Sequence, residues 1–92
     1  MAYRVLLTSA AQRQLDRLRG VALVAVRGTI LSLGAAPRPA GAVMLSGQRT
    51  LWRIRLRVDG VSWRIVYLLD DGARKVIVTR VARRDEGTYR EL

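Results

Sequence analysis

Arginines alternate with apolar residues over one short segment of the chain, in a pattern suited to binding phosphate groups. The segment reads Trp-Arg-Ile-Arg-Leu-Arg-Val, so Arg53, Arg55 and Arg57 recur at every second position. Successive side chains of a strand point to opposite sides, which places these three guanidinium groups on one face. A guanidinium offers a planar fork of donors that matches phosphate oxygens. The spacing indicates a face that binds a polyanion; the alternative is a solvated basic surface.

The next two residues, Asp59-Gly60, predict a type I′ turn that fixes the register of a hairpin. A second strand is expected over 61–69, and Arg64 then lies directly opposite Arg55. The register also pairs Arg53 with Val66, Arg57 with Ser62, Leu56 with Trp63, Ile54 with Ile65, and Trp52 with Tyr67. Like charges directly across a strand pair are unfavourable, by about 1 kcal/mol near a surface. The opposed arginines therefore favour a functional interpretation of this face.

Two other groups of residues invite a functional interpretation but are better explained by the fold. Trp52, Trp63 and Tyr67 could stack on nucleobases, but the alternation places them opposite the arginines, where a core is expected. Asp70-Asp71 could suggest a metal site. An acidic pair beside Gly72 at a hairpin tip is more often turn chemistry.

The composition limits the classes of function. The chain has 92 residues, as expected for one domain over 1–92, and a net charge of +10 from seventeen basic and seven acidic residues. All the basic residues except Lys75 are arginine. The charge predicts a nucleic-acid or acidic protein partner. Cysteine and histidine are absent, so thiol catalysis is excluded and a transition-metal site is not expected. We expect no cofactor, no membrane segment and a cytoplasmic location.

The hydrophobic pattern predicts an α+β fold in the order β-α-α-β-β-β. The expected elements are a strand over 3–7, a helix from Ser9 to Gly20, a helix over 21–33, and strands over 52–58, 61–69 and 74–82. Ser9 and Gln12 have the spacing of a capping box, and Gly20 suits a helix end. Met44-Leu45 is expected to reach the core. The helix hairpin should pack on one face of a mostly antiparallel four-stranded sheet, leaving the arginines on the free face.

Over essentially its whole length, the chain resembles the RelE/ParE superfamily of toxin–antitoxin toxins. The matching segments are Tyr3-Arg4-Val5, the helical Ala11, Leu15 and Leu18, Pro37-Arg38-Pro39, Leu45-Ser46-Gly47, Trp52-Arg53-Ile54-Arg55, Trp63-Arg64-Ile65-Val66-Tyr67, and Arg80-Val81-Ala82-Arg83-Arg84 with Tyr89-Arg90. Each segment is short, but their shared order and spacing identify the resemblance. The family fold is the one that the periodicity predicts.

The resemblance implies a mechanism and a set of site residues. RelE-type members cut messenger RNA in the ribosomal A site, by attack of the ribose 2′-hydroxyl on the adjacent phosphate to give a 2′,3′-cyclic phosphate. The positions that match the family's catalytic residues are Arg53, Arg55, Arg64, Arg84 and Tyr89. Further positions expected to bind RNA are Arg57, Arg80 and Arg83. A cognate antitoxin of the RelB, ParD or Phd kind is the implied protein partner.

The chain departs from the family in having arginine where lysine is common. Arginine does not give up its proton in proteins, so these side chains can only clamp the scissile phosphate and stabilise charge in the transition state. Tyr89 is then the general base among the matched positions, and neighbouring arginines would have to lower its pKa from about 10. The alternative for Tyr89 is an exposed tail aromatic that stacks on a base or only anchors the tail.

Two other functions fit the same scaffold. ParE-like members poison DNA gyrase without cleaving RNA, and they generally lack a complete set of basic residues and tyrosine. A degenerate toxin could act only as half of a DNA-binding repressor complex. The complete matched set favours RNA cleavage.

Overall fold

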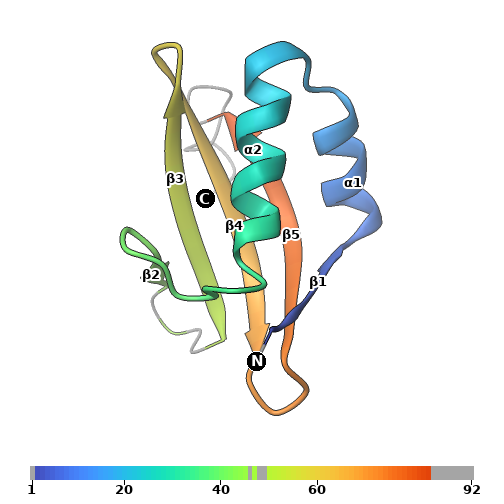
Figure 1. The fold of residues 1–92 in the computed structure, drawn as a ribbon, viewed down its shortest axis with the longest axis vertical. Coiled ribbons are helices and arrows are strands. Elements are labelled where there is room, and N and C mark those ends of the chain that lie inside the picture. The colour runs from blue at the N-terminus through green and yellow to red at the C-terminus, as the bar shows by residue number, and fades with distance from the viewer. Residues whose placement is uncertain (1, 46, 48–49, 84–92) are drawn as a thin grey trace.

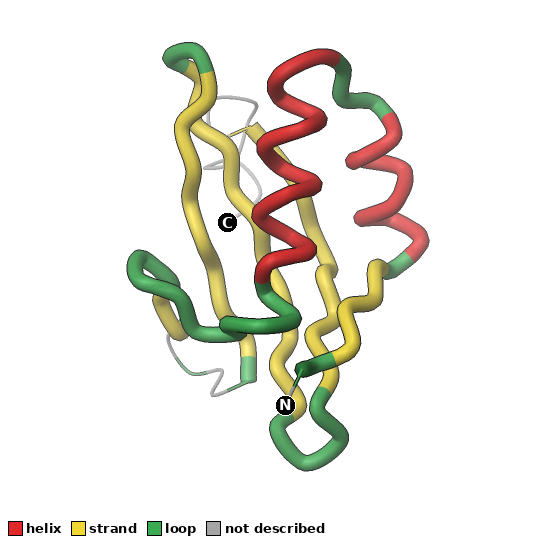
Figure 2. Tube along the Cα trace, in the orientation of Figure 1, coloured by secondary structure: helices red, strands yellow, loops and turns green. Residues whose placement is uncertain are grey.

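The computed structural model describes residues 2–45, 47 and 50–83, and it forms two layers, a pair of helices on one sheet (Figures 1 and 2). The elements in chain order are β1 (Arg4–Leu7), α1 (Ser9–Asp16), α2 (Gly20–Ser32), β2 (Val43–Met44), β3 (Leu51–Val58), β4 (Val61–Asp70) and β5 (Lys75–Arg83). The strand order is β1-β5-β4-β3-β2, with β1 parallel to β5 and every other pair antiparallel. Both helices cover the same face of the sheet. The predicted α+β fold is confirmed.

The sheet has five strands rather than the predicted four. The additional strand, β2, is two residues long and pairs Val43 with Arg53 and Met44 with Trp52. Two residues are too few to show alternation in the sequence. The expectation that Met44 reaches the core is wrong, because its side chain is 49% exposed.

The first helix begins as the local sequence suggests, but its cap is one residue earlier than predicted. Thr8 has extended backbone, and its hydroxyl accepts a hydrogen bond from the Ala11 backbone N–H at 3.1 Å. Ser9 is the first helical residue rather than the cap. Gln12 donates instead to the carboxylate of Asp16, one turn along the helix. Either hydroxyl satisfies an N-terminal N–H, and the position of the extended residue decides which one does.

Gly20 begins the second helix and does not end the first one. It has a φ of +61°, which an L residue rarely adopts, and α1 has already ended at Asp16. Arg19 donates to the backbone carbonyls of Asp16 and Leu18, satisfying acceptors that the end of α1 leaves open. The glycine is therefore needed for the tight reversal between the two helices.

The core lies between the helix pair and the sheet. Buried residues come from α1, the connection after it, α2 and the three long strands: Ala11, Leu15, Leu18, Val26, Ile30, Leu33, Ile54, Trp63, Ile65, Tyr67, Leu69, Val76, Val78 and Val81. Trp63 and Tyr67 thus belong to the core, and Trp52 packs against it, as predicted. None of the described helices is long and apolar enough to cross a bilayer.

Strand β5 contains a β-bulge that changes which of its side chains face the helices. Tyr67 pairs with Val78, but the preceding residue of β4, Val66, pairs with Arg80, so Thr79 is the extra residue. Strict alternation after Val78 would have turned Arg80 toward the core. The bulge keeps both Val78 and Val81 buried and places Arg80 on the opposite face.

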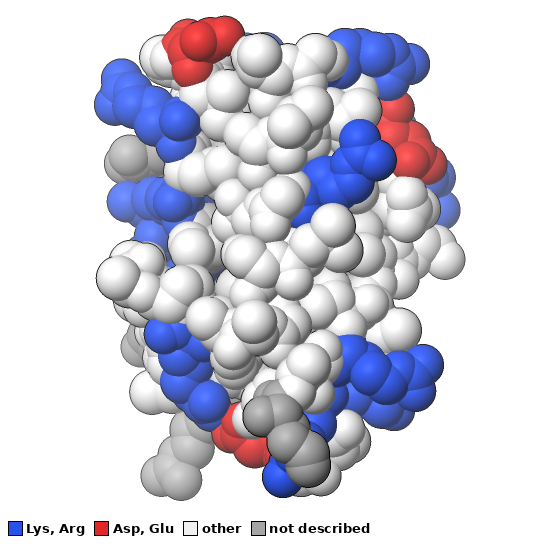
Figure 3. Space-filling view, viewed as in Figure 1, with Lys and Arg blue, Asp and Glu red and all other residues white. Residues whose placement is uncertain are grey.

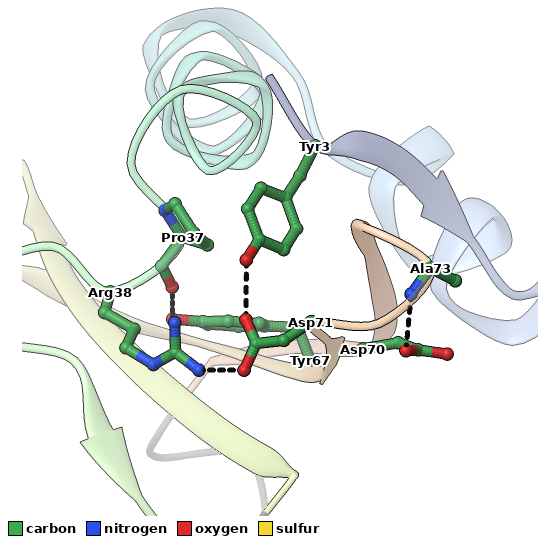
Figure 4. Close-up of polar contacts among 7 residues, drawn as sticks. All are labelled: Tyr3, Pro37, Arg38, Tyr67, Asp70, Asp71 and Ala73. Carbon is green, nitrogen blue, oxygen red and sulfur yellow. Dashed lines mark hydrogen bonds and ion pairs between the residues drawn. The ribbon is translucent and has the colours of Figure 1, made fainter. Parts of the chain in front are cut away.

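A polar network joins the linker after α2 to the turn between β4 and β5 (Figure 4). Tyr3 and Arg38 both donate hydrogen bonds to the carboxylate of Asp71, and the Tyr67 hydroxyl donates to the carbonyl of Pro37 at 2.7 Å. The bond from Arg38, followed by that from Tyr3, holds the pKa of Asp71 below its usual range. The hydrogen bond to Asp71 raises the pKa of Tyr3.

The same network explains two short motifs of the sequence. The guanidinium of Arg38 lies 5.4 Å from the centroid of the Trp52 ring, a cation–π distance. Asp70 accepts a hydrogen bond from the Ala73 N–H within the turn. The acidic pair is thus structural, as predicted, and Arg38 fixes the linker against β3 and the turn.

Candidate nucleic-acid interface

The β3–β4 hairpin has the register that the sequence predicts. Asp59 and Gly60 have φ values of 49° and 79°, the positive pair that a type I′ turn requires. Val58 pairs with Val61, and the ladder continues without a shift to Leu51 and Leu68. Arg55 therefore lies directly opposite Arg64.

Five arginines from three adjacent strands lie on the side of the sheet that the helices leave open. Residues adjacent to them in sequence, Ile54, Ile65 and Val81, are in the core. Because side chains alternate along a strand, the arginines point to the other side. We call this set the arginine face: Arg53, Arg55, Arg57, Arg64 and Arg80.

The arginine face has an exposed half and a more shielded half. Arg55 and Arg57, toward the hairpin tip, are exposed, whereas Arg53, Arg64 and Arg80 are half-buried. The Nε atoms of Arg53 and Arg64 are shielded from solvent, so these two guanidinium groups lie close to the sheet. A phosphate over the centre of the face would meet guanidinium donors from both halves, which suits the several oxygens of a phosphodiester.

The charge on this face is of one sign in the described part of the structure. No described carboxylate lies among the five arginines; along β4, the next acidic residue on that side is Asp70, at the opposite end of the strand and paired with Lys75. Across the described residues, no group of three or more His, Cys, Asp or Glu could hold a metal ion. The arrangement can bind an anion and stabilise developing negative charge, without a proton-transferring group of its own.

An apolar row beside the arginines was not predicted from the sequence. Leu51 pairs with Leu68, Leu68 with Ile77, and Ile77 with Leu6, so four aliphatic side chains cross the sheet on the face away from the helices. All four are partly buried. The adjacent pair Leu68-Leu69 was a signal for it, because one of two consecutive strand residues must point away from the core.

Not every predicted site residue belongs to the arginine face. Arg83 pairs with Trp63, so its side chain lies on the side of the helices. There it lines a cavity of about 420 Å³ with Gln14, Arg17 and Arg80. Arg84 and Tyr89 lie outside the described residues. The structure therefore brings together Arg53, Arg55, Arg57, Arg64 and Arg80 on one face; Arg83 lies on the other side and, of these five, shares the lining of the cavity with Arg80.

Comparison with known proteins shows likeness at the level of structure. No family model and no curated protein matches the chain. The toxin–antitoxin complex RelBE2 from Mycobacterium tuberculosis matches with a TM-score of 0.76 and 26% identity, over 91% of this chain and 100% of that one. The isolated E. coli RelE toxin matches with a TM-score of 0.76 and 25% identity, over 98% and 94%.

A third structure, an E. coli RelE mutant in the free state with two arginines replaced by alanine, has the same fold. It matches with a TM-score of 0.77 and 23% identity, over 99% of this chain and 94% of that one. Each of these matches covers nearly the whole length of this chain and of the matched chain. They agree with the element order already described, and they show that the chain has the fold of RelE toxins from toxin–antitoxin systems.

Proposed function

We propose that this protein is a ribosome-dependent endoribonuclease that cuts messenger RNA and so inhibits translation and growth. The observation that carries the proposal is the placement of Arg55 directly opposite Arg64, on a face that gathers five arginines from three strands. Like charges directly across a strand pair repel, and a bound anion relieves that repulsion. Likeness to RelE toxins agrees with it.

The arginines would act on the phosphate that is cleaved. In the proposed reaction the ribose 2′-oxygen bonds to the adjacent phosphorus, its proton leaves to a base, and the bond to the 5′-oxygen breaks. The products are a 2′,3′-cyclic phosphate and a 5′-hydroxyl, which takes up a proton. Arg53, Arg55 and Arg64 would stabilise the charge that builds on the non-bridging oxygens. The roles of Arg84 as a further clamp and Tyr89 as the base rest on the family resemblance.

The remaining basic residues would hold the RNA on either side of the reacting phosphate. Arg57, at the hairpin tip, and Arg80, on β5, extend the arginine face in two directions from the Arg55–Arg64 pair. Arg83 would contact RNA only from the other side of the sheet. Such contacts fix position rather than sequence, because they are made with the backbone.

The proposed protein partner is an antitoxin that covers the arginine face. Solved RelB–RelE complexes are among the structures similar to this chain, including those from E. coli and Pyrococcus horikoshii. The arginine face and the apolar row of Leu6, Leu51, Leu68 and Ile77 lie side by side on one surface. A segment with acidic residues beside aliphatic ones would complement both parts and exclude RNA. Toxin, antitoxin and ribosome would then meet in the cytoplasm.

The experiment that tests the function is primer extension on a reporter message after induced expression. Cuts at codon spacing in translated regions, absent with Arg64→Ala, are the expected result. Arg13→Ala on α1, which removes the same charge from the helix side, is the matched control and should cut like the wild type. DNA-damage signalling without message cleavage would contradict the proposal and indicate a ParE-like gyrase inhibitor.

A further inference from the structure

We propose that the outer face of helix α2 is a contact through which two copies of this chain associate. The inference goes beyond the proposed function, because α2 covers the side of the sheet opposite the arginine face. A dimer formed there would leave both arginine faces outward and accessible.

The outer face of α2 exposes large aliphatic side chains at a regular spacing. Val21, Val24 and Leu31 are 61%, 67% and 64% exposed, although the opposite side of the helix already buries Val26 and Ile30. With Gly28, the exposed positions are separated by three, four and three residues, so they form one stripe along the helix. The outward face of a surface helix is normally polar, whereas this one is apolar. We call these residues the α2 stripe: Val21, Val24, Gly28 and Leu31.

Gly28, in the middle of the stripe, has no explanation within the chain. A Cβ atom built at Gly28 would meet nothing within 4 Å, and the residue has ordinary helical backbone. Glycine weakens a helix interior relative to alanine, so some other factor must favour it. A second helix that crosses at this point would approach more closely over glycine than over any side chain.

The hydroxyl groups beside the stripe are already satisfied within the helix. The Thr29 hydroxyl donates to the Ala25 carbonyl at 2.9 Å, and the Ser32 hydroxyl donates to the Thr29 carbonyl at 2.6 Å. The usual cost of burying polar groups is a donor left unpaired, and covering these hydroxyl groups would leave none. The outer face of α2 can therefore be buried without the loss of a hydroxyl hydrogen bond.

A second copy is the occupant that the charges and the symmetry of the stripe favour. The stripe has no charged residue, and the charged residue of α2, Arg27, lies at its edge, so the stripe itself offers an apolar contact and no charge pairing. Figure 3 shows uncharged atoms over most of this face, with one basic side chain near its middle and the other charged side chains along its edges. Val24 and Leu31 flank Gly28, so an antiparallel copy crossing there would place each Val24 against the other's Leu31, as an isologous contact requires.

The size of the stripe and the net charge predict a weak association that salt strengthens. A helix of thirteen residues is about 20 Å long, and one such pair covers less than the ~800 Å² per partner of a standard stable interface. Each copy has a charge of +10, and Arg27 lies at the edge of the stripe. Screening of this repulsion should favour the dimer.

The first test is sedimentation of the purified full-length chain between about 1 μM and 1 mM, at low and high salt. We expect a monomer–dimer equilibrium that shifts toward dimer as salt rises. The double variant Val24→Gln and Leu31→Gln should remain monomeric with an unchanged melting temperature, because both side chains are already exposed. Val43→Gln, which replaces an exposed aliphatic residue on β2, should dimerise like the wild type.

The second test uses the absence of cysteine from the chain. If two helices cross at Gly28, the facing Cα atoms are roughly 4–5 Å apart, within disulfide range. Gly28→Cys should therefore form an oxidised dimer, and Val43→Cys should not.

A wild type that stays monomeric at all concentrations and salts, or a double variant that dimerises equally, would overturn the proposal. If the wild type does not self-associate and the double variant loses antitoxin binding, the stripe is an antitoxin contact instead. Message cleavage by the double variant should be unchanged, so failure here leaves the proposed function intact.

Discussion

Arg55 on β3 and Arg64 on β4 are direct cross-strand partners on the face of the sheet opposite helices α1 and α2. Their opposition follows from a two-residue turn whose residues both have positive φ. The pair is unfavourable by itself, so the free protein should respond strongly to any anion that binds between the two guanidinium groups.

Sulfate should raise the melting temperature of the free protein more than chloride does at equal ionic strength. A ligand that binds only the folded state stabilises it by about 2.7 kcal/mol at 100 times its Kd. For a domain of this size, each kcal/mol raises the melting temperature by roughly 4–8 °C. Calorimetry on wild type and Arg55→Gln measures the effect, and the variant should lose most of the difference between the two salts. An equal response in both proteins would show that the anion binds elsewhere.

Replacing Arg64 should remove activity without destabilising the fold. Arg64→Ala deletes one of two opposed like charges, whose repulsion is about 1 kcal/mol near a surface and offsets the contacts that the side chain gives up. We expect a folded variant with a melting temperature close to that of the wild type, measured by circular dichroism, together with loss of growth arrest. Arg13→Ala should keep both the melting temperature and the growth arrest of the wild type. A marked fall in melting temperature for Arg64→Ala would mean that Arg64 is structural.

The Asp71 network predicts a loss of stability at both extremes of pH. The pKa of Asp71 is lower in the folded protein than its usual 3.8, so its contribution is present above that value and is lost as pH falls below it. The pKa of Tyr3 is raised above its usual 10.0, so its contribution is present below pH 10 and is lost as pH rises further.

Thermal melts across pH for two variants check this prediction. Asp71→Asn should reduce the fall in stability on the acid side, and Tyr3→Phe should reduce it on the alkaline side. Asp59→Asn, which removes an exposed carboxylate from a turn where asparagine is favoured, is the control for the acid side. Identical acid-side curves for Asp71→Asn and the wild type would contradict the role given to the carboxylate.

The turn at Gly60 should be essential to the arginine face. Gly60 has a φ of +79°, and a β-branched residue there would be strained by roughly 1–2 kcal/mol. Gly60→Val should lower stability and weaken RNA binding together, because any change of turn type shifts the register by which Arg55 meets Arg64. Val43→Gln, outside the hairpin, should do neither. Retention of full RNA binding by Gly60→Val would contradict the dependence of the site on this register.

The sequence predicted the turn and register of the hairpin, and each strand to within one residue, because alternation and turn chemistry act over a few neighbouring residues. Asp59-Gly60 admits one favoured turn, and the register of Trp52 to Tyr67 follows from it. Features that depend on tertiary contacts were not predicted. The bulge at Thr79 arises because Val78 and Val81 must both be buried, and the alternation alone cannot show where the ladder shifts.

The contrast between local patterns and tertiary contacts also explains the other differences between the predicted and the observed structure. Arg83, next to the matched Arg84, was expected to bind RNA, but the bulge places it on the helix side with Trp63. Strand β2 forms because β3 has an open edge opposite Val43, not because two residues prefer a strand. Gly20 was expected to end a helix, and only the short reversal between α1 and α2 shows that it begins one.

Single-turnover cleavage of ribosome-bound messenger RNA by the purified protein tests the central claim most directly. Removing one preorganised donor to a developing oxyanion costs about 10²–10³ in rate. We predict that Arg64→Ala cleaves at least about a hundredfold more slowly than the wild type, whereas Arg13→Ala cleaves at the wild-type rate. Cleavage by Arg64→Ala at the wild-type rate, or none by the wild type itself, would contradict the claim that the opposed arginines bind the scissile phosphate.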